Sequence, residues 1–434
     1  MNRPLRIALL SYRSKPHSGG QGVYVRHLSR ELCALGHHVE VFSGQPYPEL
    51  DDGPVLRKVP SLDLYREDDP FRTPHPREIR DWTDALETAM MWGGSFPEPL
   101  TFSIRALRAL RARPGEFDIV HDNQGLGYGM LGVPRLGLPL VTSIHHPITV
   151  DKRLDLAGRG WLGTLSRRRW YGFVRMQGRV ARRAGPLITV SESSKRDICQ
   201  DFRVRQGSVH IVPLGVDTRR YRPRDAHAGA SSGTPRVPGR IVAVASSDHP
   251  LKGLATLLRA VAKLTTERDA HLVVIGSPSE ETRKLAAQLS LNQPDPPGGT
   301  ASPGPLANRG ATFVSGLPEE EYAELLASAE IAVVPSLYEG FSLPAVEHMA
   351  SGTPLVATKA GALPEVTGDA AVGVKPGDAE DLAAALRRLL DSPEEREALS
   401  RRGVDRVQTR FAWPAVATAT VALYRKVING ESAC

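Results

Sequence analysis

The sequence predicts an α/β protein with two doubly wound domains, each built on a parallel sheet covered by helices. Short apolar runs alternate with amphipathic segments through both halves of the chain, which is the pattern of buried parallel strands joined by helices. Residues 218–240 interrupt this pattern with a polar stretch rich in Gly, Pro and Ser. We therefore expect an N-terminal domain at 1–217, a linker at 218–240 and a second domain at 241–410.

The N-terminal half opens with a strand–helix–strand unit. An apolar run at 5–12 leads into the glycine-rich loop 15–22, an amphipathic segment stops at Gly36, and an alternating run follows at 37–44. A parallel pair joined in this way has a right-handed crossover. Three more buried strands are expected, at 117–122, 139–146 and 186–193.

The second half repeats the alternation. Apolar runs predict strands at 240–246, 271–276, 311–316, 331–336 and 354–358. Amphipathic segments predict helices at 253–267, 318–329, 343–352 and 378–392, and a long Pro/Gly loop lies at 291–310. The chain ends in an amphipathic segment, 411–430, that we expect to pack back on the first domain. Two such domains predict a cleft between them, with ligands at the carboxyl ends of the strands.

Composition limits the class of protein. The 434 residues are 41% hydrophobic and carry a net charge of +7, a mild excess that suits an anionic partner but is too dispersed to predict nucleic-acid binding. The three cysteines, Cys33, Cys199 and Cys434, form neither a disulfide framework nor a metal-binding spacing, which favours a cytoplasmic location. No apolar window approaches the roughly 18 residues of a membrane-spanning helix.

The stretch 338–358, YEGFSLPAVEHMASGTPLVAT, contains the strongest candidate for chemistry. It follows a predicted strand, and Ser342 and Gly352 are suited to begin and end a helix. The N-terminus of that helix is a ready phosphate site. Glu339 and Glu347 flank it, and as carboxylates they suit the neutral hydroxyl groups at the two ends of a nucleotide-diphosphate sugar. The plainer alternative is a loop charge and a solvated helix residue.

The segment EGFSLPAVE resembles the E-x7-E motif of retaining glycosyltransferases of family 4, whose GT-B fold has two facing Rossmann-like domains. Other segments agree in the same order along nearly the whole chain. They are SGGQGVYVRHLSREL, FDIVHDNQ, TSIHH, ITVSESSK, VPLGVDTRRYRP, LKGLATLLRAVAKL and GTPLVATKAGALPEV.

The resemblance implies a donor site in the second domain. It places Glu339 on the donor sugar, Glu347 on the ribose hydroxyls and Lys252 on the diphosphate, whose developing charge Lys252 would stabilise. Backbone N–H groups of Gly340, Phe341, Ser342 and Leu343 would bind the diphosphate and sugar. From the first domain, Gly19 and Gly20 would bring a loop close over the phosphates.

One residue departs from the family pattern. Where the family commonly has an arginine before the lysine, this chain has Ser246 and Ser247. One cation for the diphosphate is therefore missing. Either the donor is held more weakly, or the Ser247 hydroxyl and another arginine compensate.

Three histidines and an aspartate follow strands of the first domain. His145 matches the family histidine near the reacting sugar, and with Glu339 and Lys252 it completes the catalytic set that the resemblance implies. Its neighbour His146 should point the other way. His121, Asp122 and His146 are candidates for contact with the acceptor, with a structural role as the alternative.

The segment 165–185 has seven arginines, no acidic residue, and the aromatic residues Trp170, Tyr171 and Phe173. The plain interpretation is a solvated cationic helix. The alternative is peripheral contact with an anionic membrane, in which arginines meet headgroups and aromatic side chains insert.

These observations predict a hexosyltransferase that moves a sugar from a nucleotide-diphosphate sugar to a hydroxyl acceptor, a glycan or a lipid-linked molecule. A UDP-sugar is the first expectation and a GDP-sugar the next. We expect no cofactor and no metal, because the sequence has no Asp-x-Asp motif and no His/Cys cluster. The alternatives are a nucleotide-sugar epimerase, against which the E-x7-E motif argues, and a non-catalytic nucleotide-sugar-binding module, which the missing arginine favours.

Overall fold

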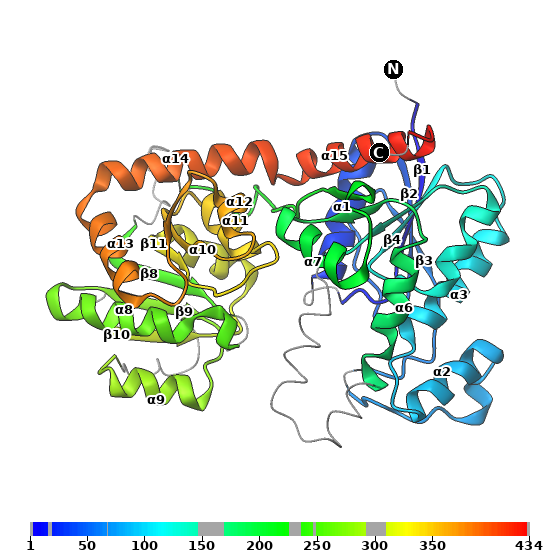
Figure 1. Ribbon diagram of the computed structural model, residues 1–434, viewed down its shortest axis with the longest axis horizontal. Coiled ribbons are helices and arrows are strands. Elements are labelled where there is room, and N and C mark those ends of the chain that lie inside the picture. The colour runs from blue at the N-terminus through cyan, green and yellow to red at the C-terminus, as the bar shows by residue number, and fades with distance from the viewer. Residues whose placement is uncertain are drawn as a thin grey trace. The chain divides into compact units, whose positions relative to one another are not determined.

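A computed structural model describes residues 3–15, 20–66, 68–145, 169–224, 236–245, 249–291 and 310–431. The chain divides into two compact units (Figure 1). Unit 1 comprises Met1–Gly215 with Val416–Cys434, and unit 2 comprises Val216–Ala415. The stretch expected as a linker therefore falls within unit 2, where its first strand begins at Val237; residues 225–235 lie outside the described part.

Unit 1 is built on a parallel seven-stranded sheet with the order β3-β2-β1-β4-β5-β6-β7. The strands are β1 Arg6–Ser11, β2 His38–Ser43, β3 Val55–Lys58, β4 Ile119–Asn123, β5 Leu140–Ser143, β6 Leu187–Thr189 and β7 Val209–Ile211. Ile7 is opposite Val39 of β2 on one side and Ile119 of β4 on the other. The strand order reverses between β1 and β4, so their carboxyl ends form a topological switch point, where such sheets bind ligands.

Helices follow the strands of unit 1 as the alternation predicts. They are α1 Gln21–Ala34, α2 Trp82–Trp92, α3 Glu98–Arg111, α6 Gly172–Ala181 and α7 Glu192–Phe202. Helix α15, Trp413–Ile428, starts in unit 2 and continues into unit 1. There Tyr424 is completely buried, and Arg425 donates a hydrogen bond to the backbone carbonyl of Arg3.

Unit 2 is built on a parallel six-stranded sheet with the order β10-β9-β8-β11-β12-β13. The strands are β8 Val237–Val244, β9 His271–Ile275, β10 Gly310–Val314, β11 Ala329–Val334, β12 Leu355–Thr358 and β13 Ala371–Val374. The helices are α8 Leu254–Glu267, α9 Glu280–Gln288, α10 Glu319–Ser328, α11 Leu343–Ala350, α12 Leu363–Thr367, α13 Ala379–Asp391 and α14 Pro393–Arg410. Here the order reverses between β8 and β11. In the described part of the chain, every helix is too short or too polar to cross a lipid bilayer.

Candidate active site

Lys252 and Glu339 meet at the switch point of unit 2. Lys252 lies after β8, in a short 3-10 turn (Pro250–Lys252), and Glu339 lies in the loop after the neighbouring strand β11. The Lys252 Nζ is 2.9 Å from Glu339 Oε1, and the Ser336 hydroxyl donates to the same oxygen at 2.7 Å. The two side chains that the sequence predicts for the donor are thus fixed against each other. An ammonium has three hydrogens, so Lys252 can keep this contact and still bind a phosphate.

Two glycines pin the backbone around this ion pair. Gly253 has φ +69, and a Cβ there would lie 2.0 Å from the Pro335 carbonyl oxygen. Gly361 has φ +54, and a Cβ there would lie 2.3 Å from the Glu339 carbonyl oxygen. The next residue, Ala362, donates its N–H to that same carbonyl at 2.9 Å. The loop that carries Glu339 is therefore packed directly against the turn after β12.

Replacing Gly361 tests whether this close packing serves donor binding. Gly361→Ala should weaken donor affinity, because the new methyl group would push the Glu339 backbone away from Lys252. The matched control is Gly316→Ala, which has a similar φ of +70 but open space around the new Cβ. Both changes carry a backbone strain of about 1–2 kcal/mol, so only Gly361→Ala should change nucleotide affinity in a calorimetric titration. Equal affinities in the two variants would contradict this.

The N-terminus of α11 has the form that the sequence predicts. Ser342 is the N-cap residue, with φ 83, and its hydroxyl accepts from the Ala345 N–H at 3.4 Å. Phe341 is 5% exposed and packs edge-on against Phe411, with ring centroids 5.7 Å apart. Among the described residues, the N–H groups of Phe341, Ser342 and Leu343 donate to no protein acceptor. They suit an anionic ligand, since a helix N-terminus attracts phosphate.

Glu347 lies in the second turn of α11 and is partly buried rather than solvated. Its Oε2 accepts a hydrogen bond of 2.6 Å from the Tyr322 hydroxyl. Burial raises the pKa of Glu347 to about 7, and the bond from Tyr322 acts in the opposite direction. The interpretation of Glu347 as an ordinary surface residue does not fit this environment. Ser247, another predicted donor contact in this unit, lies outside the described residues.

In unit 1 the glycine-rich loop leads into α1. Gly20 is the N-cap of α1, with φ 73, but a Cβ there would meet nothing within 4 Å. The expected approach of Gly20 to the donor phosphates stays a prediction. Within the unit a close approach is made by Gly22, where a Cβ would lie 2.0 Å from the Lys15 carbonyl oxygen. Gly20 thus meets a conformational requirement, and Gly22 is a residue that the sequence interpretation missed. Gly19 and His146 lie outside the described residues.

His145 follows β5 and is held by side chains that end β4. Its Nε2 is 2.7 Å from Asn123 Oδ1, and its backbone N–H donates to Gln124 Oε1 at 3.0 Å. The ring of Tyr24 packs edge-on against it, with centroids 4.3 Å apart. Burial lowers the pKa of His145 to about 4, so the ring is neutral at pH 7. Since the amide oxygen only accepts, Nε2 carries the hydrogen and Nδ1, buried with no protein partner in the described part, is an acceptor for a hydroxyl.

The neutral state of His145 leads to a pH prediction. Because its pKa is lowered to about 4, the activity of the wild type should show no titration from this group between pH 6 and 8. His145→Ala should lower kcat about 10²-fold without introducing a new pH dependence. Steady-state rates across pH 6–8 provide the measurement. A wild-type inflection near pH 6.5 that is lost in His145→Ala would contradict the neutral role.

His121 and Asp122 are engaged inside unit 1. His121 is completely buried, with Nδ1 2.6 Å from the Tyr424 hydroxyl of α15 and Nε2 2.6 Å from the Ser143 hydroxyl. Asp122 is 1% exposed and accepts from the Leu126 N–H at 2.8 Å. Burial lowers the pKa of His121 to about 3 and raises that of Asp122 to about 6. These contacts favour the structural interpretation of both residues over contact with the acceptor.

The aromatic residues of the segment 165–185 are partly buried and pack against other side chains of unit 1, which favours the plain interpretation of a cationic helix. Trp170 packs against Tyr65, Phe71 and Phe96, with ring centroids 5.3–5.8 Å apart. Phe173 contacts Phe96 at 5.4 Å. The described arginines are exposed, namely Arg169, Arg175, Arg179, Arg182 and Arg183. Membrane contact stays a prediction, and the part of it that does not depend on the aromatic side chains is electrostatic; residues 165–168 lie outside the described part.

Vesicle co-sedimentation tests that remaining part. We expect the protein to pellet with anionic vesicles at low salt and to be released at high salt, since each basic residue near such a surface contributes about 1 kcal/mol. Changing Arg175, Arg179 and Arg183 to Ser should weaken the binding. The control removes three exposed arginines of unit 2, Arg388, Arg401 and Arg402. Equal pelleting of both triple variants would contradict a role for the arginines of residues 169–183.

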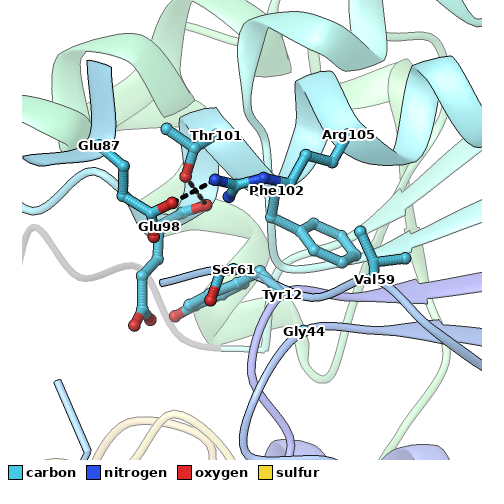
Figure 2. A pocket seen from close by; sticks show the side chains of 9 residues that line it. All are labelled: Tyr12, Gly44, Val59, Ser61, Glu87, Glu98, Thr101, Phe102 and Arg105. Carbon is cyan, nitrogen blue, oxygen red and sulfur yellow. Dashed lines mark hydrogen bonds and ion pairs between the residues drawn. The ribbon is translucent and has the colours of Figure 1, made fainter. Parts of the chain in front are cut away.

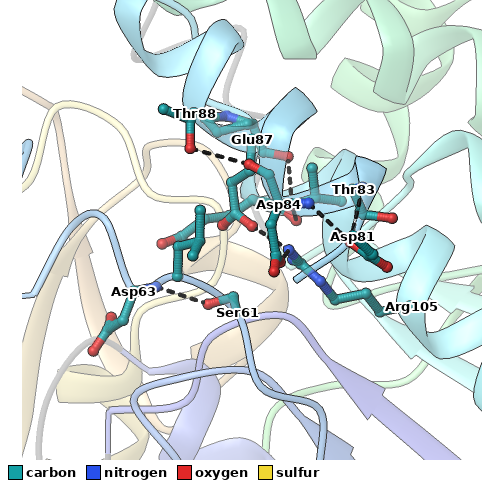
Figure 3. A network of polar contacts seen from close by, with 12 residues as sticks. Ser61, Asp63, Asp81, Thr83, Asp84, Glu87, Thr88 and Arg105 are labelled. Carbon is teal, nitrogen blue, oxygen red and sulfur yellow. Dashed lines mark hydrogen bonds and ion pairs between the residues drawn. The ribbon is translucent and has the colours of Figure 1, made fainter. Parts of the chain in front are cut away.

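A buried cluster of charge lies beside the carboxyl ends of β1, β2 and β3 in unit 1. Figure 2 shows a small cavity where Glu87, Glu98 and Thr101 lie near Tyr12 and Arg105. Figure 3 shows the Arg105 guanidinium between Asp84 and Glu87, with which it forms ion pairs. Glu98 forms an ion pair with Arg13, and burial raises the pKa of the Glu98 carboxyl to about 7. The network joins α2 to α3, so we assign it a structural role.

Metal ligation has no candidate in the described part of the chain, where no three His, Cys, Asp or Glu side chains gather into a potential site. The positive groups available to an anionic ligand in unit 2 are the Lys252 ammonium and the partial positive charge at the N-terminus of α11. Both lie at the edge of the unit 2 sheet.

Two family profiles match this chain. The profile described as Glycosyltransferase Family 4 matches residues 18–220, and that described as Glycosyl transferases group 1 matches residues 238–392. An MMP α-(1→4)-mannosyltransferase of Mycolicibacterium hassiacum is 53% identical over 436 residues, covering 99% of this chain and 100% of that protein. A D-inositol 3-phosphate glycosyltransferase of Nocardioides sp. is 30% identical, covering 97% of this chain and 90% of that protein.

Solved structures agree in fold. Sucrose-phosphate synthase from Thermosynechococcus elongatus matches with a TM-score of 0.64 at 23% identity, over 98% of this chain and 100% of that one. HepE of Anabaena, solved in complex with UDP, matches with a TM-score of 0.64 at 16% identity, over 97% of this chain and 100% of that one. Two Rossmann-like units with this order of elements give the GT-B fold. The chain belongs to glycosyltransferase family 4 and is an enzyme of that class.

Proposed function

We propose that this enzyme is a retaining mannosyltransferase that takes mannose from a nucleoside-diphosphate mannose and forms an α-(1→4) linkage to a hydroxyl of a saccharide acceptor. The structural observation that carries the donor assignment is the Lys252–Glu339 ion pair at the switch point of unit 2, with Glu347 in the helix that follows. The sugar and the linkage rest on the relative that is 53% identical over the full chain and is named as an α-(1→4)-mannosyltransferase.

Each group has a task in this reaction. The Glu339 carboxylate accepts a hydrogen bond from a hydroxyl of the mannose, and the Glu347 carboxylate accepts from the ribose hydroxyls. Lys252 and the N–H groups at the start of α11 bind the diphosphate and stabilise its charge as the bond to the anomeric carbon breaks. The acceptor oxygen forms the new bond, and its proton leaves with the nucleoside diphosphate. In our proposal these positive groups stabilise the diphosphate in place of a metal. Lys252 also supplies the positive charge that the absent arginine would have supplied.

The first experiment identifies the donor. A thermal-shift panel of UDP, GDP and ADP, each with and without mannose or glucose, should single out one base, since a ligand at 100 times its Kd stabilises a protein by about 2.7 kcal/mol. The best mannosyl donor is then incubated with α-mannoside acceptors, with and without EDTA. We expect transfer in both conditions. A requirement for Mn²⁺ would contradict the metal-free part, and a strict preference for a glucosyl donor would contradict the choice of sugar.

A non-catalytic binding module is the alternative from another class. It would bind a nucleotide sugar and release no nucleotide during incubation with any acceptor. Family membership and the intact E-x7-E motif, Glu339 to Glu347, argue for turnover. Release of free nucleotide that depends on both acceptor and Glu339 would exclude the module.

A further inference from the structure

We propose that Tyr322 is a positioning residue for recognition of the nucleotide: its hydroxyl fixes Glu347 Oε2, which leaves Oε1 to accept the ribose hydroxyls. This inference rests on the proposed function, because it deepens the role of Glu347 in the donor site. The sequence places Tyr322 25 residues before Glu347, on a different helix. Neither the motif nor the family resemblance includes it.

The geometry around Tyr322 is rigid. Its hydroxyl donates to Glu347 Oε2 at 2.6 Å, the short distance expected for a phenol on a carboxylate. Its ring packs against the apolar cluster that includes Val242, Val314 and Leu326. From another side Tyr221 meets it edge-on, with ring centroids 6.1 Å apart and an interplanar angle of 88°. A ring packed in this way holds the carboxylate in one orientation.

The hydrogen bond from Tyr322 stabilises the ionised form of Glu347. Within the described residues, no Lys or Arg forms an ion pair with it, and Tyr322 is its one recorded hydrogen-bond partner. Burial favours the protonated form, and the Tyr322 bond favours the ionised form. The elements packed against α11 and the segment before α10 carry further titratable groups. They include Tyr221, the Arg220–Glu319 and Arg224–Glu324 ion pairs, Glu320, Glu321, the neutral His348, Glu365, and Arg406, whose guanidinium binds backbone carbonyls.

The consequence is that the affinity for the ribose of the nucleotide depends on pH. An ionised carboxylate accepts from both hydroxyls of a ribose, whereas a protonated one must donate from one oxygen. Nucleotide affinity should therefore fall as the pH drops through the pKa of Glu347, which lies at about 7. Without the Tyr322 hydroxyl that pKa rises further, so the fall in affinity should begin at a higher pH. At pH 9 the carboxylate is ionised in both proteins, so the difference in affinity that persists there measures the loss of positioning alone.

The test compares Tyr322→Phe with Tyr221→Phe by calorimetric titration of the nucleoside diphosphate that the wild type binds best, and of its 2′,3′-dideoxy analogue, from pH 6 to 9. Each variant loses one hydroxyl from neighbouring rings, but only that of Tyr322 contacts Glu347 through a recorded hydrogen bond. Tyr322→Phe should bind the nucleotide about tenfold more weakly at pH 7, as for loss of a hydrogen bond to a charged group, with little change for the analogue. Tyr221→Phe should match the wild type.

Glu347→Gln and the double variant with Tyr322→Phe separate positioning from general damage. If Tyr322 acts through Glu347, adding Tyr322→Phe to Glu347→Gln should cause no further loss of affinity. Titration of the phosphates is common to all variants, so only differences between them count. The inference would be overturned if Tyr322→Phe kept the wild-type nucleotide affinity, the wild-type preference for the nucleotide over its dideoxy analogue, and the wild-type midpoint for the fall in affinity with pH. The proposed function would then remain intact. A wild type that binds no nucleotide would overturn both.

Discussion

Lys252→Ala should lower kcat for sugar transfer by about 10²–10³-fold, the usual effect of removing a group that stabilises charge in the transition state. The effect should be at the upper end, because the chain has serines where a second diphosphate cation is expected. The change also leaves Glu339, whose side chain is 12% exposed, without its cation. Glu339→Gln removes the other half of the pair and should lower kcat in the same way, whereas Glu347→Gln should act mainly on KM for the donor.

The control for these substitutions is Lys263→Ala. Lys263 lies on α8 of the same unit and also forms an ion pair, with Glu380, but its side chain is 45% exposed and that of Glu380 is 74% exposed. Its loss should leave kcat and KM unchanged. Steady-state kinetics with the donor identified above provide the readout. Full activity in both Lys252→Ala and Glu339→Gln would remove the assignment of the donor site.

Arg105→Met should destabilise unit 1 by about 3–5 kcal/mol, because removing one partner leaves buried charges uncompensated. Arg105 is the cation between Asp84 and Glu87, whose side chains are 3% and 0% exposed. Unfolding is followed by calorimetry, in which the transition of unit 1 should move to lower temperature. Such a loss is large against the whole stability of a domain.

The pH dependence gives this prediction a sign. Burial raises the pKa of Glu87 in the folded state, so its protonation relieves the unpaired charge as the pH falls. The stability lost in Arg105→Met should therefore be largest at pH 8 and smaller at pH 5. The matched control is Arg108→Met, one turn along α3, whose pair with Asp81 is about 40% exposed on both sides and should cost no more than about 1 kcal/mol. Equal losses of unfolding free energy in Arg105→Met and Arg108→Met would contradict the claim that the burial of the Asp84 and Glu87 carboxylates makes Arg105 important for stability.

Much of the fold could be predicted because its strands are short apolar runs. The expected strand at 271–276 is β9, His271–Ile275, and the expected helix at 253–267 is α8, Leu254–Glu267. Several elements were missed, and two of them show why. The edge strand β3, Val55–Lys58, has no buried residue and so no apolar pattern. Helix α2 buries Asp84 and Glu87, which a sequence pattern assigns to the surface.

The candidate site was predictable where the chemistry lies in one short stretch. Glu339, Ser342 and Glu347 lie in one nine-residue stretch that follows a strand, so their shared place at the sheet edge could be predicted from the sequence. Tyr322 and Asn123 could not be found in this way, because each contacts its partner across 20 or more residues, and nothing local distinguishes them. Ser336 did carry a signal, as a hydroxyl at the strand end three residues before Glu339.

The most direct test of the central claim is the anomeric configuration of the product, measured by NMR after transfer of ¹³C-labelled mannose from its α-linked nucleotide donor to an α-mannoside acceptor. We expect an α-linked mannose on the 4-hydroxyl, formed by the wild type and absent with Glu339→Gln. A β-linked product would contradict retention. Equal product from the wild type and Glu339→Gln would contradict the donor site at the edge of β8 and β11.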